Sequence, residues 1–152
     1  MGLIALRPND PEYCVPAPDL SNVDPSIDFL AACWPILDPL ARYQMAKVRG
    51  NERLVNNHRK YFENESAMER ANPYRLLVRG EETHRPPIMI IQGTADDNVN
   101  HEWQDAFAER YIAAGGDCLV HKFEGQPHTF VTKNSDEPHS KAALKILQDF
   151  VS

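Results

Sequence analysis

The chain is poor in three features that mark whole classes of proteins: positive charge, cysteine and long apolar runs. Its 152 residues carry 16 Lys and Arg against 22 Asp and Glu, which gives a net charge of −6. That balance argues against a nucleic-acid-binding surface and against binding to anionic membranes. No apolar run approaches the roughly 18 residues that are needed to span a bilayer. We therefore expect neither nucleic acid nor membrane as a partner.

Cysteine is too scarce and too scattered for a zinc knuckle or a disulfide framework. Cys14, Cys33 and Cys118 are odd in number and form no CxxC pair. Reduced thiols are typical of a cytoplasmic protein, and the short apolar N-terminus, which Pro8 stops, does not resemble a signal peptide. The sequence thus predicts a cytoplasmic chain in which Cys33 is an inert core residue.

The first half of the chain alternates between proline-rich, apolar and helical stretches. Five prolines make residues 7–28 an expected irregular connection. The continuous apolar run at 29–34 predicts a strand that is buried on both faces. Residues 35–85 are polar and are expected to form a helical insertion. Its expected helices lie at 39–50, at 51–61 after Gly50, and at 66–70 with Ser66 as the cap, and Asn72-Pro73 is expected to stop the last one.

Strand and helix alternate from residue 86 onward. The clearest buried strand is 88–91, and a second strand is expected at 118–123. Between them Asn100 caps a helix that runs to about residue 114, and Pro138 opens a final helix. This alternation specifies a parallel sheet with crossover helices. The predicted fold class is therefore α/β: the C-terminal part of a mostly parallel, doubly wound sheet, with strand–helix–strand–helix over 86–152 and a cap-like helical insertion at 35–85.

Two polar loops follow the two strands of this C-terminal part. Asp96 lies in QGTADDNV after the first strand, and His128 lies in EGQPHTF after the second. Functional groups collect at the carboxyl ends of parallel strands, so both side chains are expected at one rim of the sheet. A carboxylate beside a histidine accepts the Nδ1 proton and stabilises the imidazolium that forms when Nε2 takes a proton from a nucleophile. Asp97 is the alternative acid, although a turn or helix-cap role suits it better.

These motifs, in this order, resemble the C-terminal part of an α/β-hydrolase. The stretch PPIMIIQGTADDNV, a helix that ends AAGG, a strand and FEGQPHTF are similar to those of small carboxylesterases and of dienelactone-hydrolase-like or prolyl-oligopeptidase-like members. In that family the last strands carry a G-x-x-D acid loop and a G-x-x-H-x-F histidine loop. The resemblance puts Asp96 on the catalytic acid and His128 on the general base. It implies serine-hydrolase-type cleavage of a carboxylic ester or related acyl bond in a small substrate, with no metal or organic cofactor.

The nucleophile of such an enzyme is absent from the sequence. A serine hydrolase carries it on a G-x-S-x-G elbow upstream of the acid, and none of the six serines here has that setting. Residues 1–6 resemble the tail of the helix that follows the elbow. We therefore expect an upstream half to supply the serine and the oxyanion hole, and the chain alone to be inactive. A fragment, an internal start and a separate partner chain remain alternative explanations, and the exposed sheet edge is expected to bind that half or a second copy.

Two functions of other classes remain open. One is a non-catalytic interaction module that keeps the hydrolase scaffold. The other is a metal-dependent hydrolase, although no compact metal-ligand spacing such as HExxH occurs and His121 and His139 are expected at the surface. A last set of side chains either lines an acyl or alcohol pocket or packs the insertion on the sheet: Trp34, Tyr43 and Met45.

Overall fold

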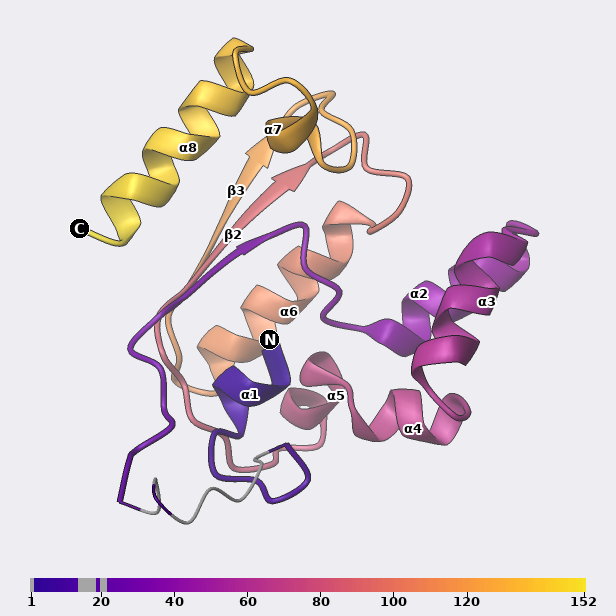
Figure 1. Ribbon diagram of the computed structural model, residues 1–152, viewed down its shortest axis with the longest axis vertical. Helices are drawn as coiled ribbons and strands as arrows, with labels where there is room; N and C mark the ends of the chain where they lie inside the picture. Colours follow the sequence, from indigo (N-terminus) through magenta and orange to yellow (C-terminus); the bar gives the residue numbers. More distant parts are fainter. Residues whose placement is uncertain (1, 14–18, 20–21) are drawn as a thin grey trace. The chain divides into compact units, whose positions relative to one another are not determined.

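The computed structural model describes residues 2–13, 19 and 22–152 (Figure 1). The chain forms two units, each assembled from separate segments of sequence. One unit contains the described part of Met1–Asp28 together with Leu37–Pro86, and the other contains Phe29–Ile36 together with Pro87–Ser152. Cys14 and part of the connection expected at 7–28 lie outside the described residues. Among the described helices, none has the length and apolar character that crossing a bilayer requires.

The second unit is built on a three-stranded parallel sheet. Its strands are β1 (Leu30–Cys33), β2 (Ile88–Gly93) and β3 (Cys118–Phe123), in the order β1-β2-β3. Ile88 is opposite Leu30 on one side and Cys118 on the other, so all three strands start in register. The sequence prediction of an α/β fold with a mostly parallel sheet is confirmed.

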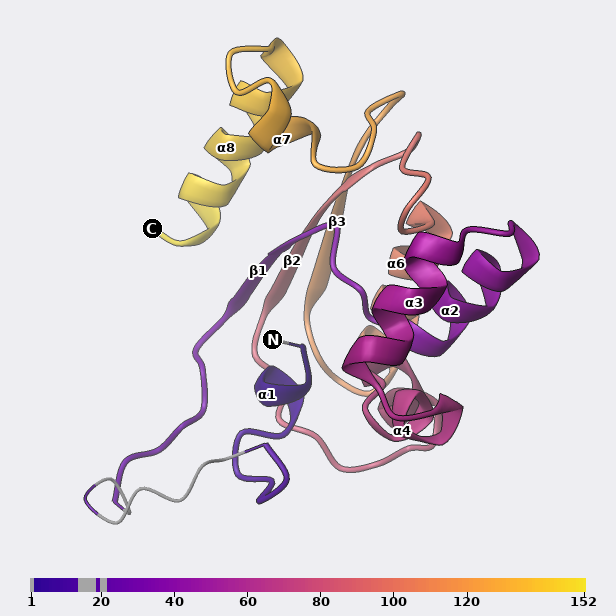
Figure 2. The ribbon, with the colours of Figure 1, turned by 45° about the vertical axis from the view of Figure 1, so that its right-hand side comes forward.

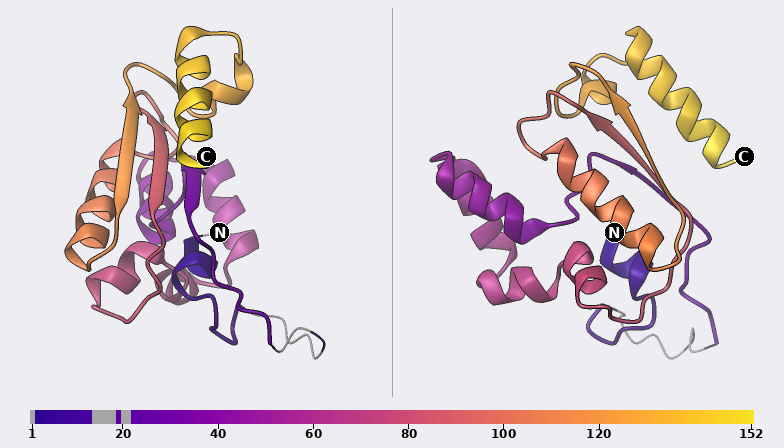
Figure 3. Two further views of the ribbon diagram at one scale, coloured as in Figure 1. Left: turned by 90° about the vertical axis from the view of Figure 1, so that its left-hand side faces the viewer. Right: turned by 180° about the vertical axis from the view of Figure 1, so that it is seen from behind.

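Two helices cover the two faces of this sheet. α6 (His101–Ala113) lies on one face and α8 (Pro138–Phe150) on the other, with the short α7 (Phe130–Lys133) next to α8 (Figure 3). The pleat of β2 alternates its apolar side chains between these faces. Met89 and Ile91 join the core under α8, which also holds Phe123, Phe130, Val131 and Ala143. Every residue of β2 is buried, as the sequence indicated.

The burial predicted for the 29–34 strand is wrong in part. Only Leu30 of β1 is buried, and the other three residues of the strand are half-buried. The physical reason is position: among the described residues β1 bonds to β2 alone, so it is an edge strand. An apolar run predicts a strand in the middle of a sheet only when both of its neighbours are present.

The first unit is helical, and Asx side chains begin its helices. It contains the short N-terminal α1 (Gly2–Leu6) and four further helices: α2 (Pro39–Val48), α3 (Glu52–Tyr61), α4 (Glu65–Arg70) and α5 (Pro73–Val78). The N-caps are Asp38, Asn51, Asn64 and Asn72, and each accepts a hydrogen bond from a backbone N–H of the first turn. Gly50 follows α2 with φ +64°, as expected for a residue just beyond a helix end.

Two local predictions in this unit are corrected. Asn64, not Ser66, caps α4, because its side-chain oxygen accepts the N–H of Ala67 at 2.9 Å. α4 ends at Arg70, as the stop at Asn72-Pro73 predicted, but the same pair also starts α5, a helix that was not expected. Proline suits the first turn of a helix, where its missing N–H has no partner to lose, and Asn72 caps that turn.

α2 and α3 pack side by side around a small core (Figure 2). Its buried members are Tyr43, Ala46, Leu54, Val55 and Met68. A buried polar contact joins two helix starts in the same unit, since the amide of Asn72 donates to the carboxylate of Asp38 at 2.8 Å. One carboxylate therefore caps α2 and anchors the cap of α5.

His58 of α3 is buried against a permanent cation. Its Nε2 lies 2.9 Å from the guanidinium Nη1 of Arg42 in α2, and its ring contacts Tyr43 and Phe62. Because arginine can only donate, Nε2 must accept, and the ring carries its proton on Nδ1. Burial, and then the charge of Arg42, lower the pKa of His58 to about 4.

This environment predicts a pH-dependent loss of stability. The unfolded chain binds a proton at His58 near pH 6.5, whereas the folded chain does so only near its pKa of about 4. Stability should therefore fall as the pH is lowered through that window, by an amount on the order of 3 kcal/mol. Urea unfolding followed by circular dichroism at a series of pH values measures it. His58→Gln should remove most of the slope, whereas His139→Gln, at an exposed position, should keep it; equal slopes in all three proteins would contradict the assignment.

Candidate active site

Asp96 and His128 meet at the carboxyl ends of two adjacent strands. Asp96 follows β2 and His128 follows β3, and their Oδ2 and Nδ1 atoms lie 2.8 Å apart. The Asp96 side chain is fully buried, and that of His128 is 22% exposed. The geometry expected from the two loop motifs is present, while the catalytic roles of both residues stay predictions.

Four N–H groups surround the Asp96 carboxylate. Oδ1 accepts the backbone N–H groups of Asn98 and Val99, each at 2.8 Å. Oδ2 accepts the side-chain amide of Gln92 at 3.0 Å and faces Nδ1 of His128. Because Oδ2 of the buried carboxylate can only accept, Nδ1 of His128 must carry the proton and donate it to Oδ2, and Nε2 keeps its lone pair.

The backbone is strained on both sides of the imidazole. Trp34 (φ +42°) and Thr129 (φ +60°) are the non-glycine residues with positive φ in the described part of the chain. The Trp34 ring lies edge-on to the His128 ring, with centroids 5.9 Å apart, and also contacts Phe130. Thr129 follows His128 directly and donates its hydroxyl to the His128 carbonyl. Positive φ at such residues costs free energy and is typical of functional sites.

The acid loop and the histidine loop are joined by their own backbones. The N–H of Thr94 donates to the carbonyl of Phe123 at 3.0 Å, and that of Ala95 donates to the carbonyl of Gln126 at 3.1 Å. In the other direction, the N–H of Gly125 donates to the hydroxyl of Thr94 at 2.8 Å. The spacing between Asp96 and His128 is therefore set by ordered backbone and not by the two side chains alone.

The other residues weighed from the sequence lie elsewhere. Asp97 is exposed, and Asn100, not Asp97, caps α6. Tyr43 packs inside the helical unit, in keeping with the packing interpretation. Cys33 and Cys118 are free thiols, and burial raises the pKa of both, to about 12 for Cys118 with help from the charge of Asp117. Thiols held protonated in this way are poor nucleophiles.

No metal centre accompanies the site in the part of the chain that the structure describes. There, no group of three or more His, Cys, Asp or Glu side chains is arranged to hold an ion. His121 is half-buried on β3, and His139 is exposed, with its ring edge against Phe123. A carboxylate that is hydrogen-bonded to an imidazole, as in the Asp96–His128 pair, has the composition of a proton-transfer site.

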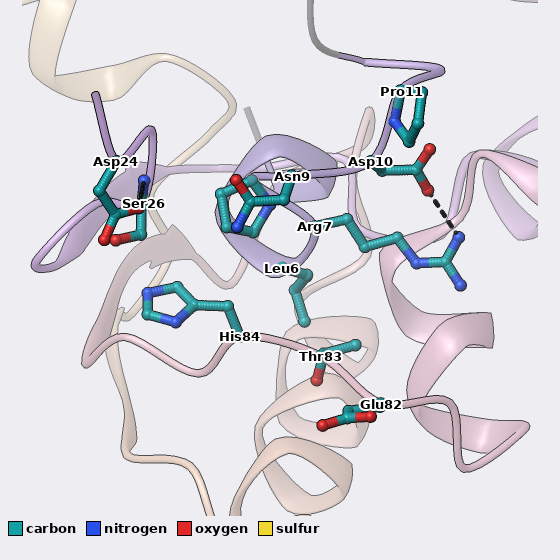
Figure 4. A pocket seen from close by; sticks show the side chains of 11 residues that line it. Leu6, Arg7, Asn9, Asp10, Pro11, Asp24, Ser26, Glu82, Thr83 and His84 are labelled. Carbon is teal, nitrogen blue, oxygen red and sulfur yellow. Dashed lines mark hydrogen bonds and ion pairs between the residues drawn. The ribbon is translucent and has the colours of Figure 1, made fainter. Parts of the chain in front are cut away.

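The helical unit contains a hollow of its own, with a volume near 780 Å³ (Figure 4). Residues 6–11 line it from one side and residues 82–84 from another, with Asp24 and Ser26 beside them. Arg7 pairs with Asp10 at 3.1 Å, and His84 contacts the carbonyl of Ile27 at 3.2 Å. Arg7 and His84 are thus both engaged by neighbouring residues, and the sequence predicted no role for this segment.

Sequence reasoning also missed two buried amides behind Asp96. Gln92 and Gln104 have exposures of 0% and 1%. One signal was available: a glutamine inside the apolar run Ile-Ile-Gln-Gly is out of place unless its amide has a partner.

Comparison with known proteins agrees with this architecture. The model of the prolyl oligopeptidase family matches residues 28–150. The chain therefore belongs to the prolyl oligopeptidase family, whose members have the α/β-hydrolase fold. A comparison with curated proteins found no match.

Solved structures of one bacterial esterase are similar to the chain over 99% of its length. Esterase 2 of the planctomycete Thermogutta terrifontis with propionate bound has 25% identity and a TM-score of 0.66. The same esterase phosphonylated by sarin has 21% identity and a TM-score of 0.68, and its apo form has 24% identity and a TM-score of 0.62. The chain spans about half the length of these esterase structures.

Proposed function

We propose that this chain supplies the Asp–His part of a serine-hydrolase triad that cleaves a carboxylic ester or a related acyl bond. The hydrogen bond of 2.8 Å between Asp96 and His128, at neighbouring strand ends of a prolyl-oligopeptidase-family fold, carries the proposal. The nucleophilic serine and the oxyanion donors come from sequence outside these 152 residues. The propionate-bound esterase makes a short acyl group the first substrate to test. The free thiols of Cys33 and Cys118 support a reducing, cytoplasmic setting.

The mechanism assigns one proton-transfer role to each group. Nε2 of His128 takes the proton from the serine hydroxyl as the oxygen attacks the substrate carbonyl, and returns it to the departing alcohol. Asp96 holds the Nδ1 proton and stabilises the imidazolium between these events. In the second half of the reaction, Nε2 of His128 takes a proton from a water molecule that attacks the acyl-enzyme, and returns it to the departing serine oxygen. No step requires a metal ion or an organic cofactor.

The test is hydrolysis of p-nitrophenyl propionate by the longest polypeptide that the gene's open reading frame encodes. Activity that is lost in His128→Ala and in Asp96→Asn supports the proposal. If the reading frame encodes a G-x-S-x-G elbow upstream and the folded protein is still inactive, the result would instead favour a non-catalytic module.

We further propose that β1 is the edge at which the other half of the hydrolase docks. Among the described residues β1 pairs on one side only, and Phe29, which precedes it, is 42% exposed. α8 leaves Leu144 41% exposed, and Val151 beyond it is 51% exposed. An open edge beside exposed apolar side chains favours pairing with another chain.

The 152-residue chain alone should accordingly self-associate or precipitate. Sedimentation velocity over a range of concentrations measures this. In the parallel ladder the N–H groups of Leu30 and Trp34 bond to β2, so that of Ala31 faces the open edge, and replacing Ala31 with proline, which cannot donate to a new strand, should reduce the association. A stable monomer at every concentration would contradict the docking edge.

A further inference from the structure

We propose that Gln92 and Gln104 are positioning residues that hold the Asp96 carboxylate in line with His128 through a relay of two buried amides. The relay begins at the carbonyl of Pro35 and ends at Asp96 Oδ2. Its catalytic meaning rests on the function proposed above.

The amide of Gln92 has only one orientation that satisfies its surroundings. Its Nε2 lies within hydrogen-bond distance of three oxygens: 3.0 Å from Asp96 Oδ2, 3.1 Å from the carbonyl of Gly93 and 3.3 Å from the carbonyl of Val99. All three oxygens accept, so the NH2 end of the amide must face them. The Gln92 side-chain oxygen is then left pointing toward α6.

Gln104 of α6 completes the relay. Its Nε2 donates to Oε1 of Gln92 at 3.2 Å and to the carbonyl of Pro35, just beyond β1, at 2.8 Å. The Oε1 atom of Gln104 is buried and has no hydrogen-bond partner among the described residues. A buried acceptor without a partner costs free energy, and the amide keeps this orientation because its NH2 end donates to two oxygens.

The relay supplies what the backbone does not. Two backbone N–H groups hold Oδ1 of Asp96. At Oδ2, by contrast, the donors are two side chains: His128 itself and the amide of Gln92. Without that donor the carboxylate can rotate about its Cβ–Cγ bond, and the line from Oδ2 to Nδ1 of His128 is lost. With it, one oxygen is fixed toward the loop and the other toward the imidazole.

The test measures the hydrogen bond itself in the longest polypeptide that the gene's open reading frame encodes, labelled with ¹⁵N-histidine. The Nδ1 proton of His128 is followed by NMR, together with the ring nitrogen shifts that report the tautomer. Gln92→Met keeps the size of the side chain and removes its donor, and Gln104→Met removes the second link without touching Asp96. Gln148→Met, at an exposed position on α8, is the matched control.

In both relay variants the Nδ1 proton should exchange with water about tenfold faster or more, and its resonance should move upfield, while the control is unchanged. If Gln92→Met fails to fold, Gln104→Met decides. An unchanged proton in Gln104→Met overturns the relay, and failure of both variants to fold would assign the amides to folding and overturn it as well.

This outcome is separable from that of the proposed function, because the NMR signal requires neither serine nor turnover. An inactive longer protein with a protected Nδ1 proton would defeat the function and leave the relay intact. In an active longer protein, Gln104→Met should lower kcat and leave KM unchanged.

Discussion

The 152-residue chain is expected to hydrolyse p-nitrophenyl propionate no faster than buffer does, and His128→Ala should leave that rate unchanged. The Asp96–His128 pair is a base and its support, and a base accelerates acyl transfer only by deprotonating a nucleophile that is held against the carbonyl. None of the serines in the sequence lies in an elbow motif, and burial keeps the thiols of Cys33 and Cys118 protonated.

The same pair should have a large effect once a nucleophile is present. In a longer polypeptide that carries the elbow, His128→Ala should lower kcat by about 10⁶-fold, as removal of a triad histidine does. Asp96→Asn should lower it by about 10⁴-fold, because the amide no longer fixes the Nδ1-protonated tautomer. Initial rates with a chromogenic ester measure both effects.

His139→Ala is the control for these substitutions, because it removes an exposed histidine from the same unit. The proposal would be contradicted if the 152-residue chain hydrolysed the ester and His128→Ala abolished that activity. The nucleophile would then lie within these residues or be water.

The sequence predicted an element of the fold correctly where the residues of that element themselves determine its structure. β2 is apolar throughout and is buried, and Asn100 and Gly50 mark helix ends where their side-chain and backbone preferences require. The stop predicted at Asn72-Pro73 is confirmed by the end of α4, but the start of α5 was missed because the pair suits a helix start as well as a stop. The burial of β1 was misjudged because it depends on the strands beside it, and its described neighbour β2 is distant in sequence.

The candidate site divides in the same way. Asp96 and His128 were predicted from loop motifs, because strand ends and spacing alone place them at one rim. The residues that support this pair, such as Trp34 and Gln104, were not predicted, because the role of each depends on tertiary contacts. The positive φ of Trp34 and the amide of Gln104 have no signature in their own neighbourhoods; they are explained only by a ring and a carbonyl that other elements bring close.

Gly93→Ala, at the end of β2, should disrupt the site far more than Gly125→Ala, the same change in the histidine loop. A Cβ at this position would lie 2.2 Å from the carbonyl oxygen of Gln126 and 2.8 Å from its carbonyl carbon. That oxygen also accepts the N–H of Ala95, so it cannot withdraw without breaking a bond between the acid loop and the histidine loop. The loops must separate by roughly 1 Å, a displacement large enough to reduce turnover by about 10²-fold.

We therefore expect Gly93→Ala to lower the free energy of unfolding by about 3 kcal/mol and to remove the protected Nδ1 proton of His128. Gly125→Ala is the matched control in the histidine loop: its Cβ meets no atom within 4 Å, so only its φ of +68° opposes the change. Its cost should be about 1–2 kcal/mol, and the Nδ1 proton should remain protected. Because the two variants add the same methyl group, a difference in the proton signal isolates loop separation from general destabilisation. Retention of that signal in Gly93→Ala would mean that the spacing of Asp96 and His128 does not depend on close contact between the loops.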